Sequence, residues 1–438
     1  MKITATLCRL AIVVGILASV STQAATPLQQ QGGSTAILME GFHWDSTNYS
    51  GPDWYVIMTN NAADMKALGI THVWFPPPSD SGSAQGYLPR QLNVFNSEYG
   101  AQSELQNAIN TFAGQGIKSV VDTVINHRVG TTNYIDFTNP TWDCTSIVSN
   151  DSSVGGCGTP DTGETFTAAR DLDHTNSQVA AGIPAWMALL KNMGFTGLRY
   201  DYSMGYRGAI QANYTNAFNP DFCVDEIWTT LNLSNINAHR QIEMNYMSGD
   251  GASCTNSSDP TCGGGNGATC GTFDFTTHGL LVEALNNNDY NVLADSNNNP
   301  AGAIGWWPAM EVTFVDNHDT GPAESCNSGQ NLWPVPCGSV MQGYAYILSH
   351  PGIPTIFYPH VYNWNLRSQI LPLVNARKAA GVNSTSPVSI QAATSGLYAA
   401  IITGTVHKLA MKIGPNSWSP GAGWTLQTSG NNYAVWMN

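Results

Sequence analysis

The sequence GLRYDYS, which begins at Gly197, decides the fold class, because an apolar run leads directly into acidic and polar residues. The same pattern recurs in DTVINH from Asp122, CVDEIW from Cys223 and FVDNHDT from Phe314. A short apolar run of this kind is typical of a strand that is buried on both faces of a parallel sheet. Strands that end in carboxylates predict a barrel whose catalytic groups lie at one rim.

Eight apolar runs are predicted to be strands. They are residues 36–39, 72–75, 119–124, 197–201, 222–226, 272–275, 312–315 and 354–358. Helical patterns lie between them, such as residues 103–112, where Ser103 and Gln106 form a candidate capping box. Gly182 and Pro184 interrupt another helical stretch, so we expect that helix to start late or to kink. This alternation predicts an α/β fold, a (β/α)8 TIM barrel.

Two parts of the chain break the alternation. Residues 128–170 are rich in Gly, Asn, Thr and Asp, and an insertion of that length predicts a small domain beside the barrel rim after the third strand. From residue 381 to residue 438, alternating stretches separated by Gly, Pro and Asn predict a C-terminal antiparallel β-sheet domain. Its predicted strands are residues 397–402, 408–413, 424–427 and 433–436.

Three carboxylates, Asp201, Glu226 and Asp319, stand at predicted strand ends. An unpaired charge in an apolar segment is unfavourable and is usually kept for a partner or a task. Cleaving a glycosidic bond needs one carboxylic acid to protonate the departing oxygen and a second carboxylate on the opposite face of the sugar. The pattern therefore favours glycoside chemistry over three unrelated surface acids.

In this order and spacing, the four blocks resemble the conserved regions of the α-amylase family of retaining glycoside hydrolases. The stretches GTPDTGETFTAARDLDH from Gly158, THVWFPPPS from Thr71 and GWWPAMEVTFVDNHDTG from Gly305 are similar to its plant-type and bacterial calcium-dependent members. The resemblance covers nearly all of the chain beyond its N-terminal segment. It implies an enzyme that acts on α-1,4-glucans, with residues 128–170 as the counterpart of the family's domain B.

The resemblance implies a role for each acid. Asp201 is expected to be the nucleophile, Glu226 the general acid and base, and Asp319 the carboxylate that stabilises the transition state. Arg199 lies two residues before Asp201, so both side chains leave the same face of an extended strand. The charge of Arg199 is expected to keep the nucleophile ionised.

Other residues of the blocks are implied to bind the sugar. His127 and His318 are expected to hydrogen-bond its hydroxyl groups, and Tyr87 is expected to cover the apolar face of the ring. Asp122 is implied to brace Arg199 and the sugar, although a buried structural ion pair explains this acid equally well.

The resemblance also implies Ca²⁺ between the insertion and the barrel, because hard oxygen ligands can pin a segment that has little core of its own. The implied ligands are Asn126, Asp161, Asp171 and the backbone carbonyls of Glu164 and Gly205. Without the resemblance, the Asp and Asn side chains would be interpreted as turn residues.

The sequence departs from its relatives at two informative positions. Met204 stands where the family commonly carries Lys or Arg, which leaves binding on the leaving-group side open. Thr165 stands where close plant relatives have an Asp, so we expect one firm calcium site.

The N-terminus carries the pattern of a secretory signal peptide. Lys2 and Arg9 precede an apolar stretch at residues 10–20, and small residues follow up to Ala24. The stretch is too short to span a bilayer, so residues 1–24 predict export and a secreted protein.

Removing this segment takes Cys8 from the nine cysteines and leaves an even number in an oxidising compartment. A zinc site is the alternative, but no C-x-x-C pair is present. From proximity we hypothesise four disulfides, although the sequence alone leaves their connectivity open. They are Cys144 with Cys157, Cys254 with Cys262, Cys326 with Cys337, and Cys223 with Cys270.

The composition of the chain limits the kinds of binding partner that are expected. The formal net charge is −14, only 11% of residues are charged, and no cluster of Lys and Arg is present. Such a chain is not expected to bind nucleic acid or an anionic membrane. A neutral polysaccharide such as starch, glycogen or a malto-oligosaccharide fits this surface, and we expect a monomer.

The predicted organisation is a signal peptide (1–24), a first barrel part (25–127), a calcium-binding insertion (128–170), a second barrel part (171–380) and the C-terminal domain (381–438). The predicted function is a secreted, calcium-dependent, endo-acting α-amylase. An exo-acting enzyme that releases one malto-oligosaccharide stays open, because the same carboxylates serve both. A non-catalytic glucan-binding protein that keeps the scaffold, or a transglycosylase, also stays open.

Overall fold

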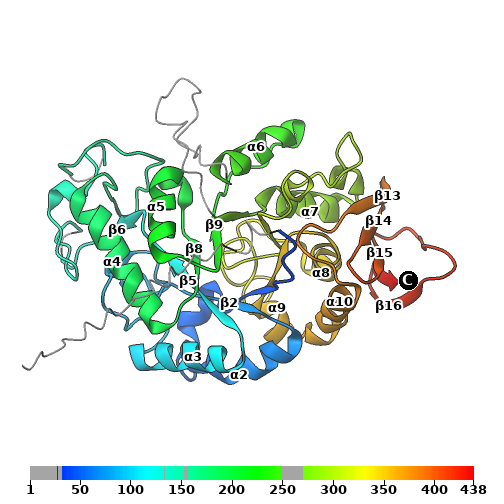
Figure 1. The fold of residues 1–438 in the computed structure, drawn as a ribbon, viewed down its shortest axis with the longest axis horizontal. Helices are drawn as coiled ribbons and strands as arrows, with labels where there is room; N and C mark the ends of the chain where they lie inside the picture. Colours follow the sequence, from blue (N-terminus) through cyan, green and yellow to red (C-terminus); the bar gives the residue numbers. More distant parts are fainter. Residues whose placement is uncertain (1–26, 28–31, 133, 152–155, 248–269) are drawn as a thin grey trace, which may run out of the picture.

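The computed structural model describes residue 27 and residues 32–132, 134–151, 156–247 and 270–438, and within them eight parallel strands close into a barrel (Figure 1). These strands are β1 (Leu38–Glu40), β2 (His72–Phe75), β5 (Lys118–Thr123), β8 (Gly197–Tyr200), β9 (Phe222–Asp225), β10 (Gly271–Phe273), β11 (Glu311–Phe314) and β12 (Ile353–Phe357). Strand β12 pairs with β1 and completes the closure. The predicted TIM barrel is confirmed, and every predicted strand end lies within two residues of the observed one.

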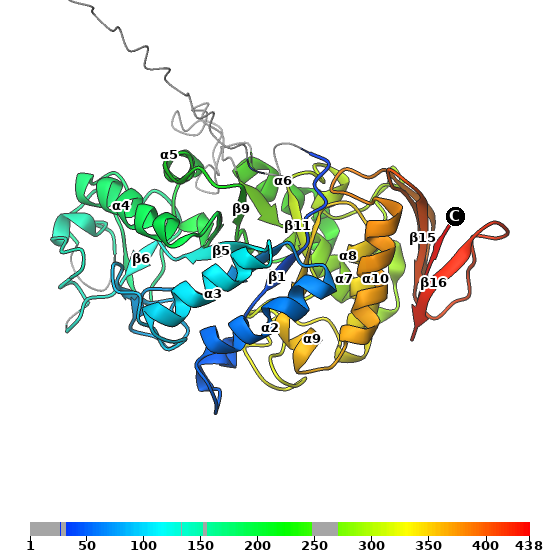
Figure 2. The ribbon, with the colours of Figure 1, turned by 60° about the horizontal axis from the view of Figure 1, so that its bottom comes forward.

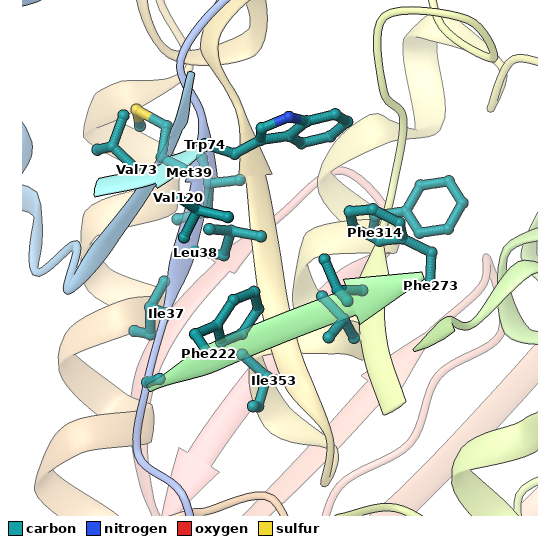
Figure 3. Packing of buried hydrophobic residues seen from close by; sticks show 14 of the residues in the cluster. Ile37, Leu38, Met39, Val73, Trp74, Val120, Phe222, Phe273, Phe314 and Ile353 are labelled. Carbon is teal, nitrogen blue, oxygen red and sulfur yellow. The ribbon is translucent and has the colours of Figure 1, made fainter. Parts of the chain in front are cut away.

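The barrel is packed with side chains and is not a pore. Leu38, Trp74, Val120, Phe222 and Phe273 come from five different strands and are at most 1% exposed (Figure 3). Bulky residues that fill the interior in this way leave only the rims for binding.

Helices surround the barrel (Figure 2). They are α2 (Trp54–Leu68), α3 (Gln102–Gly114), α4 (Ser177–Met193), α5 (Gly208–Phe218), α6 (Ile236–Met247), α7 (Phe275–Asn287), α8 (Val340–Ser349), α9 (Tyr358–Tyr362) and α10 (Arg367–Ala380). Helix α3 buries Leu105, Ile109 and Phe112 as predicted. Its predicted capping box is wrong, because the Glu104 carboxylate accepts the backbone N–H of Ala101 (2.8 Å), ahead of the expected pair.

The late start predicted for the helix around Gly182 is also wrong. Helix α4 begins at Ser177, because the Asn176 side chain caps it by accepting the N–H of Gln178, and it continues through Pro184. Gly182 instead allows close packing, since a Cβ there would lie 2.4 Å from the ring of Trp142 in the insertion.

The insertion leaves and rejoins the barrel through two short strands that pair with each other. Strand β6 (His127–Arg128) is antiparallel to β7 (Arg170–Asp171), with His127 opposite Asp171 and Arg128 opposite Arg170. Residues 128–170 therefore lie between β5, the third barrel strand, and β8, the fourth, and their assignment as an inserted domain stays a prediction.

The C-terminal domain is a five-stranded antiparallel sheet in the order β13 (Val388–Thr394), β14 (Leu397–Thr403), β15 (Lys408–Ile413), β17 (Tyr433–Met437) and β16 (Thr425–Gly430). It lies at the end of the molecule away from the insertion, with α8 packed against β15 and β17 (Figures 1 and 2). Strand β13 was not predicted; its burial alternates only over the first five residues, and a bulge shifts its register between Ile390 and Ala392.

Three of the four hypothesised disulfides are present: Cys144–Cys157, Cys223–Cys270 and Cys326–Cys337. The proposed Cys254–Cys262 pair and the predicted signal peptide lie outside the described residues. No helix in the described part of the chain is long and apolar enough to cross a membrane.

Candidate active site

The predicted catalytic residues meet in one pocket at the rim where the barrel strands end. Asp201 follows β8 directly, Glu226 follows β9 directly, and Asp319 lies in the loop after β11. The residues that line this pocket are Trp44, Tyr87, His127, Phe166, Asp201, Tyr202, Glu226, Trp228, His318, Asp319 and Gln330. Parallel strands deliver their C-terminal ends to the same rim, which is why residues far apart in the sequence converge.

The guanidinium of Arg199 joins three carboxylates of the site. Its Nη1 donates to Asp122 Oδ1 (2.9 Å) and to Asp201 Oδ1 (2.8 Å), and its Nη2 lies 2.8 Å from Glu226 Oε2. The Arg199 side chain is 1% exposed, so these charge-assisted contacts are shielded from water. One planar cation therefore fixes the nucleophile candidate and the acid candidate relative to each other.

Asp122 is the carboxylate that pairs with Arg199 from the neighbouring strand. It pairs directly with Arg199 in the β5–β8 register, and its Oδ2 accepts the indole N–H of Trp74 (3.0 Å) and the hydroxyl of Tyr87 (2.9 Å). Arg199 also lies 4.9 Å from the centre of the Trp74 ring. Asp122 is fully buried and its oxygens are used by protein donors, so it braces Arg199 and Tyr87.

Among the described residues, the buried carboxyl groups at the pocket outnumber the one buried cation, Arg199. Burial raises the pKa of Asp201 well above its usual value, and Arg199 opposes this shift without overcoming it. Burial, together with Glu226, raises the pKa of Asp319 to about 7, and burial raises the pKa of Asp122 to about 6. Arg199 acts on Asp201 in the predicted direction, but desolvation is the larger effect.

The backbone N–H of Tyr202, a residue with a strained backbone conformation, is a second hydrogen-bond donor to Glu226. Tyr202, next to Asp201, has φ 44° and ψ 51°, a left-handed conformation that is uncommon for a residue other than glycine. In this conformation its backbone N–H donates to Glu226 Oε2 (2.9 Å). The strain thus serves to aim a donor at the acid candidate.

Comparison with known proteins identifies the family of the chain. Residues 53–141 match the α-amylase catalytic domain and residues 379–437 match the α-amylase C-terminal β-sheet domain. The chain is 37% identical to probable α-amylase 2 of Arabidopsis thaliana over 91% of its own length and 93% of that protein. The chain belongs to the α-amylase family. It is an enzyme of the glycoside hydrolase class, as predicted.

Two further comparisons are informative. A glucan 1,4-α-maltotetraohydrolase of Stutzerimonas stutzeri is 29% identical over 89% of this chain and 70% of that protein. The structure of the Geobacillus thermoleovorans α-amylase in complex with acarbose has the same fold, with a TM-score of 0.64 at 15% identity, and the match covers 94% of this chain and 98% of that one.

Two groups of stacked rings line the pocket. Tyr87 and His318 have nearly parallel rings with centres 5.1 Å apart, and Trp44 is parallel to both. His127 stacks on Phe166, with ring centres 4.0 Å apart, and its Nε2 lies 2.8 Å from the carbonyl oxygen of Tyr87. The predicted sugar-binding residues Tyr87, His127 and His318 therefore lie in the pocket.

Several pocket residues were not predicted. Trp44 follows the first strand in GFHW, and Trp228 follows Glu226, so a strand-end rule could have found both. Phe166 and Gln330 come from loops, and neither follows a barrel strand closely enough for the strand-end rule to find it. Gln330 nonetheless donates from its side chain to Asp319 Oδ1 (2.6 Å).

Met204, one of the two positions where the chain is expected to depart from its relatives, is not among the residues that line the pocket. Its side chain is buried and packs against Ile227 and Tyr246. Its carbonyl accepts the N–H of Glu164 and so ties the insertion to the barrel (2.9 Å). The absent Lys or Arg is therefore replaced by a packing residue.

The side chains of the predicted calcium ligands Asn126, Asp161 and Asp171 form a cradle of oxygen atoms. Asn126 Nδ2 donates to Asp171 Oδ1 (3.1 Å), and a Cβ on Gly205 would lie 2.0 Å from Asn126 Oδ1. Asn126 Oδ1 and Asp161 Oδ2 are buried without a hydrogen-bond partner among the described residues. Burial raises the pKa of Asp161 to about 6 and that of Asp171 to about 7. Orphaned oxygens and desolvated carboxylates fit a hard cation.

A second acidic cluster, not predicted, lies apart from these ligands. Oxygens of Glu243, Asp274 and Glu311 are within 4.8 Å of one another, and all three residues are buried. Asp274 is occupied by the backbone N–H groups of Thr277, Ala303 and Ile304, so it serves as the N-cap of α7. Burial raises the pKa of Glu243 and of Glu311 well above the usual value, which favours neutral acids there.

Replacing Arg199 with Gln tests the central ion cluster. The change leaves three buried carboxylates without their cation, so we expect the free energy of unfolding at neutral pH to fall by about 3–5 kcal/mol. Carboxylates without a cation have folded-state pKa values above the unfolded ones, so the penalty exists above the unfolded pKa and shrinks as the pH falls toward about 4. Urea unfolding at several pH values measures it. Arg367→Gln, which removes an exposed pair with Asp64, is the control, expected to lose less than about 1 kcal/mol. Equal losses would contradict the role of Arg199.

Proposed function

We propose that this chain is a secreted, calcium-dependent, endo-acting α-amylase that hydrolyses internal α-1,4 bonds of starch and related glucans with retention of configuration. The observation that carries the proposal is the shared contact of Asp201 and Glu226 with one guanidinium, in the pocket that also contains Asp319. Two carboxylates held this way can flank one glycosidic bond.

In this proposal each acid has one task. Glu226 protonates the departing oxygen while Asp201 attacks the anomeric carbon and forms a covalent glycosyl intermediate. Glu226 then removes a proton from water, which displaces Asp201. Asp319 stabilises the positive charge that develops on the sugar ring, and Tyr87 supports the apolar face of that ring.

Replacing Glu226 with Gln tests the acid assignment. We expect starch hydrolysis to fall by about 10²–10⁴-fold, because the amide cannot protonate the leaving oxygen. Acarbose binding, measured by calorimetry, should persist. Glu283→Gln on α7 is the control that should keep full activity. A wild-type protein that binds acarbose but releases no reducing ends from starch would instead support a non-catalytic glucan-binding protein.

Endo action is supported by the lining of the pocket. Tyr87 and Trp44 belong to one aromatic group, and Phe166 and Tyr202 belong to another. Two sugar-binding platforms suit a chain that continues past the cleaved bond. The chain is also more similar to the plant α-amylase than to the maltotetraohydrolase, the relative that supports exo action as the alternative.

Product profiling separates the two modes. An endo-acting enzyme cuts at random internal bonds, so we expect soluble starch to give a broad mixture of malto-oligosaccharides in the first few per cent of hydrolysis. Chromatography of early samples provides the measurement. A single dominant oligomer from the earliest time point would reject endo action, and products longer than the substrate would indicate transglycosylation.

Calcium is proposed to bind Asn126, Asp161, Asp171 and the backbone carbonyls of Glu164 and Gly205. The two orphaned side-chain oxygens and the desolvated acids of the cradle support this set. Bound there, the ion would join the insertion to the loops after β5 and β8, and so hold one wall of the pocket in place.

Chelation tests the calcium site. We expect excess chelator to lower the melting temperature substantially and added Ca²⁺ to restore it, because a ligand that binds only the folded state stabilises it. Asp171→Asn should melt lower and respond less to either reagent. Asp143→Asn, an exposed acid of the insertion, is the control that should retain the full response. An unchanged melt in chelator would reject the site.

Secretion is proposed from the signal-peptide pattern of residues 1–24, and the three described disulfides suit an oxidising compartment. The proposed partner is a neutral glucan, and the protein is proposed to act as a monomer. N-terminal sequencing of the exported protein checks cleavage near Ala24.

A further inference from the structure

We propose that Glu40 is a positioning residue for the reaction, which acts through His318: its buried carboxylate holds the imidazole so that Nε2 carries a proton toward Asp319 and the sugar. The effect of Glu40 on catalysis rests on the proposed function. The protonation of His318, in contrast, is a property of the free protein and can be measured without a substrate.

The contacts run in a line from the barrel to the pocket. Glu40 is the last residue of β1 and is fully buried. Its Oε1 lies 2.7 Å from His318 Nδ1 and accepts the backbone N–H of His318 (3.3 Å). On the other side of the ring, His318 Nε2 lies 3.2 Å from Asp319 Oδ2. One imidazole therefore bridges a buried carboxylate and a catalytic one.

Aromatic rings fix the plane of this imidazole. Tyr87 and Trp44 lie parallel to it within 3°, at 5.1 and 6.3 Å between ring centres. Phe42 lies 5.1 Å away and Trp74 meets the ring edge-on at 5.5 Å. Rings packed on this scale exclude water from around His318, so the charge of Glu40 is felt with little screening.

Each of the two contacts requires one proton. An imidazole nitrogen and a carboxylate oxygen both carry lone pairs, so these short separations, 2.7 Å to Glu40 and 3.2 Å to Asp319, are attractive only when a proton lies between the two atoms. The proton next to Glu40 is shared by Oε1 and Nδ1. The second proton lies between Nε2 and Asp319, and the negative charge of Glu40 favours keeping it on the nitrogen.

The surroundings of Glu40 and His318 favour a proton shared between the two side chains over two separate ions. Burial raises the pKa of Glu40 well above its usual value and lowers the pKa of His318 well below its own, so neither group is stable as an isolated ion. Arg199 opposes the shift of Glu40 and adds to that of His318. The other titratable groups that interact with Glu40 are Asp319, Asp122, Tyr99 and Tyr344, and Asp319 in turn interacts with Glu226.

Replacing Glu40 with Gln removes the charge and keeps the shape. The amide oxygen must occupy the Oε1 position, because the backbone N–H of His318 points at it, so Nδ1 stays a donor. Without the carboxylate charge, the second proton leaves Nε2 at a lower pH. We therefore expect the alkaline limb of the kcat/KM profile on starch to move to lower pH by about 1–3 units.

Glu311→Gln is the matched control. Glu311 is also a fully buried barrel glutamate with one oxygen that lacks a hydrogen-bond partner among the described residues, but it lies at the start of β11 and not at the pocket rim. We expect its pH profile to match that of the wild type. Glu40→Asp retains the charge, so it should keep the wild-type position of the alkaline limb even where kcat falls.

Nitrogen-15 NMR of histidine-labelled protein is the second measurement, with His318→Gln to assign the signals. We expect Nε2 of His318 to be protonated in the wild type at neutral pH and to lose its proton at lower pH in Glu40→Gln. An unprotonated Nε2 in the wild type overturns the proposal even if Glu40→Gln does not fold. An alkaline limb that stays in place in Glu40→Gln, or moves equally in Glu311→Gln, also overturns it. A wild type without starch hydrolysis rejects the proposed function instead, and the NMR result still decides the role of Glu40.

Discussion

Three buried carboxylates depend on the single guanidinium of Arg199. Asp122, Asp201 and Glu226 come from three neighbouring strand ends. Burying the charge of any one of them without a partner would cost several kcal/mol of desolvation free energy. The cation gives each acid a partner and at the same time fixes their separation. The need to keep these charges paired is therefore also what sets the geometry of the proposed catalytic groups.

Other residues of the barrel rim are hydrogen-bonded to the carboxylates that Arg199 holds. Trp74 and Tyr87 donate to Asp122, so the platform proposed to carry the sugar is part of the same network as the cation. The left-handed backbone conformation of Tyr202 directs its N–H toward Glu226 Oε2. Both contacts tie residues of the pocket wall to the carboxylates that Arg199 holds.

Much of this could be predicted from the sequence, because the strands of a parallel barrel are short apolar runs whose ends are chemically distinct. The position of Asp122 opposite Arg199 follows from that pattern once the strands pair in order. Phe166 and Gln330 escaped prediction because loop paths bring them to the pocket, and no local period encodes a loop path. Glu40 escaped for another reason: it ends an apolar run as the other acids do, but its partner His318 is remote in sequence.

The β6–β7 pair has a consequence for how this fold can diversify. His127, which lines the pocket, lies directly opposite Asp171, a proposed calcium ligand, in a ladder only two residues long. Both ends of the insertion thus leave the barrel side by side through one narrow neck. Insertions or deletions beyond that neck would therefore leave the path of the barrel strands unchanged.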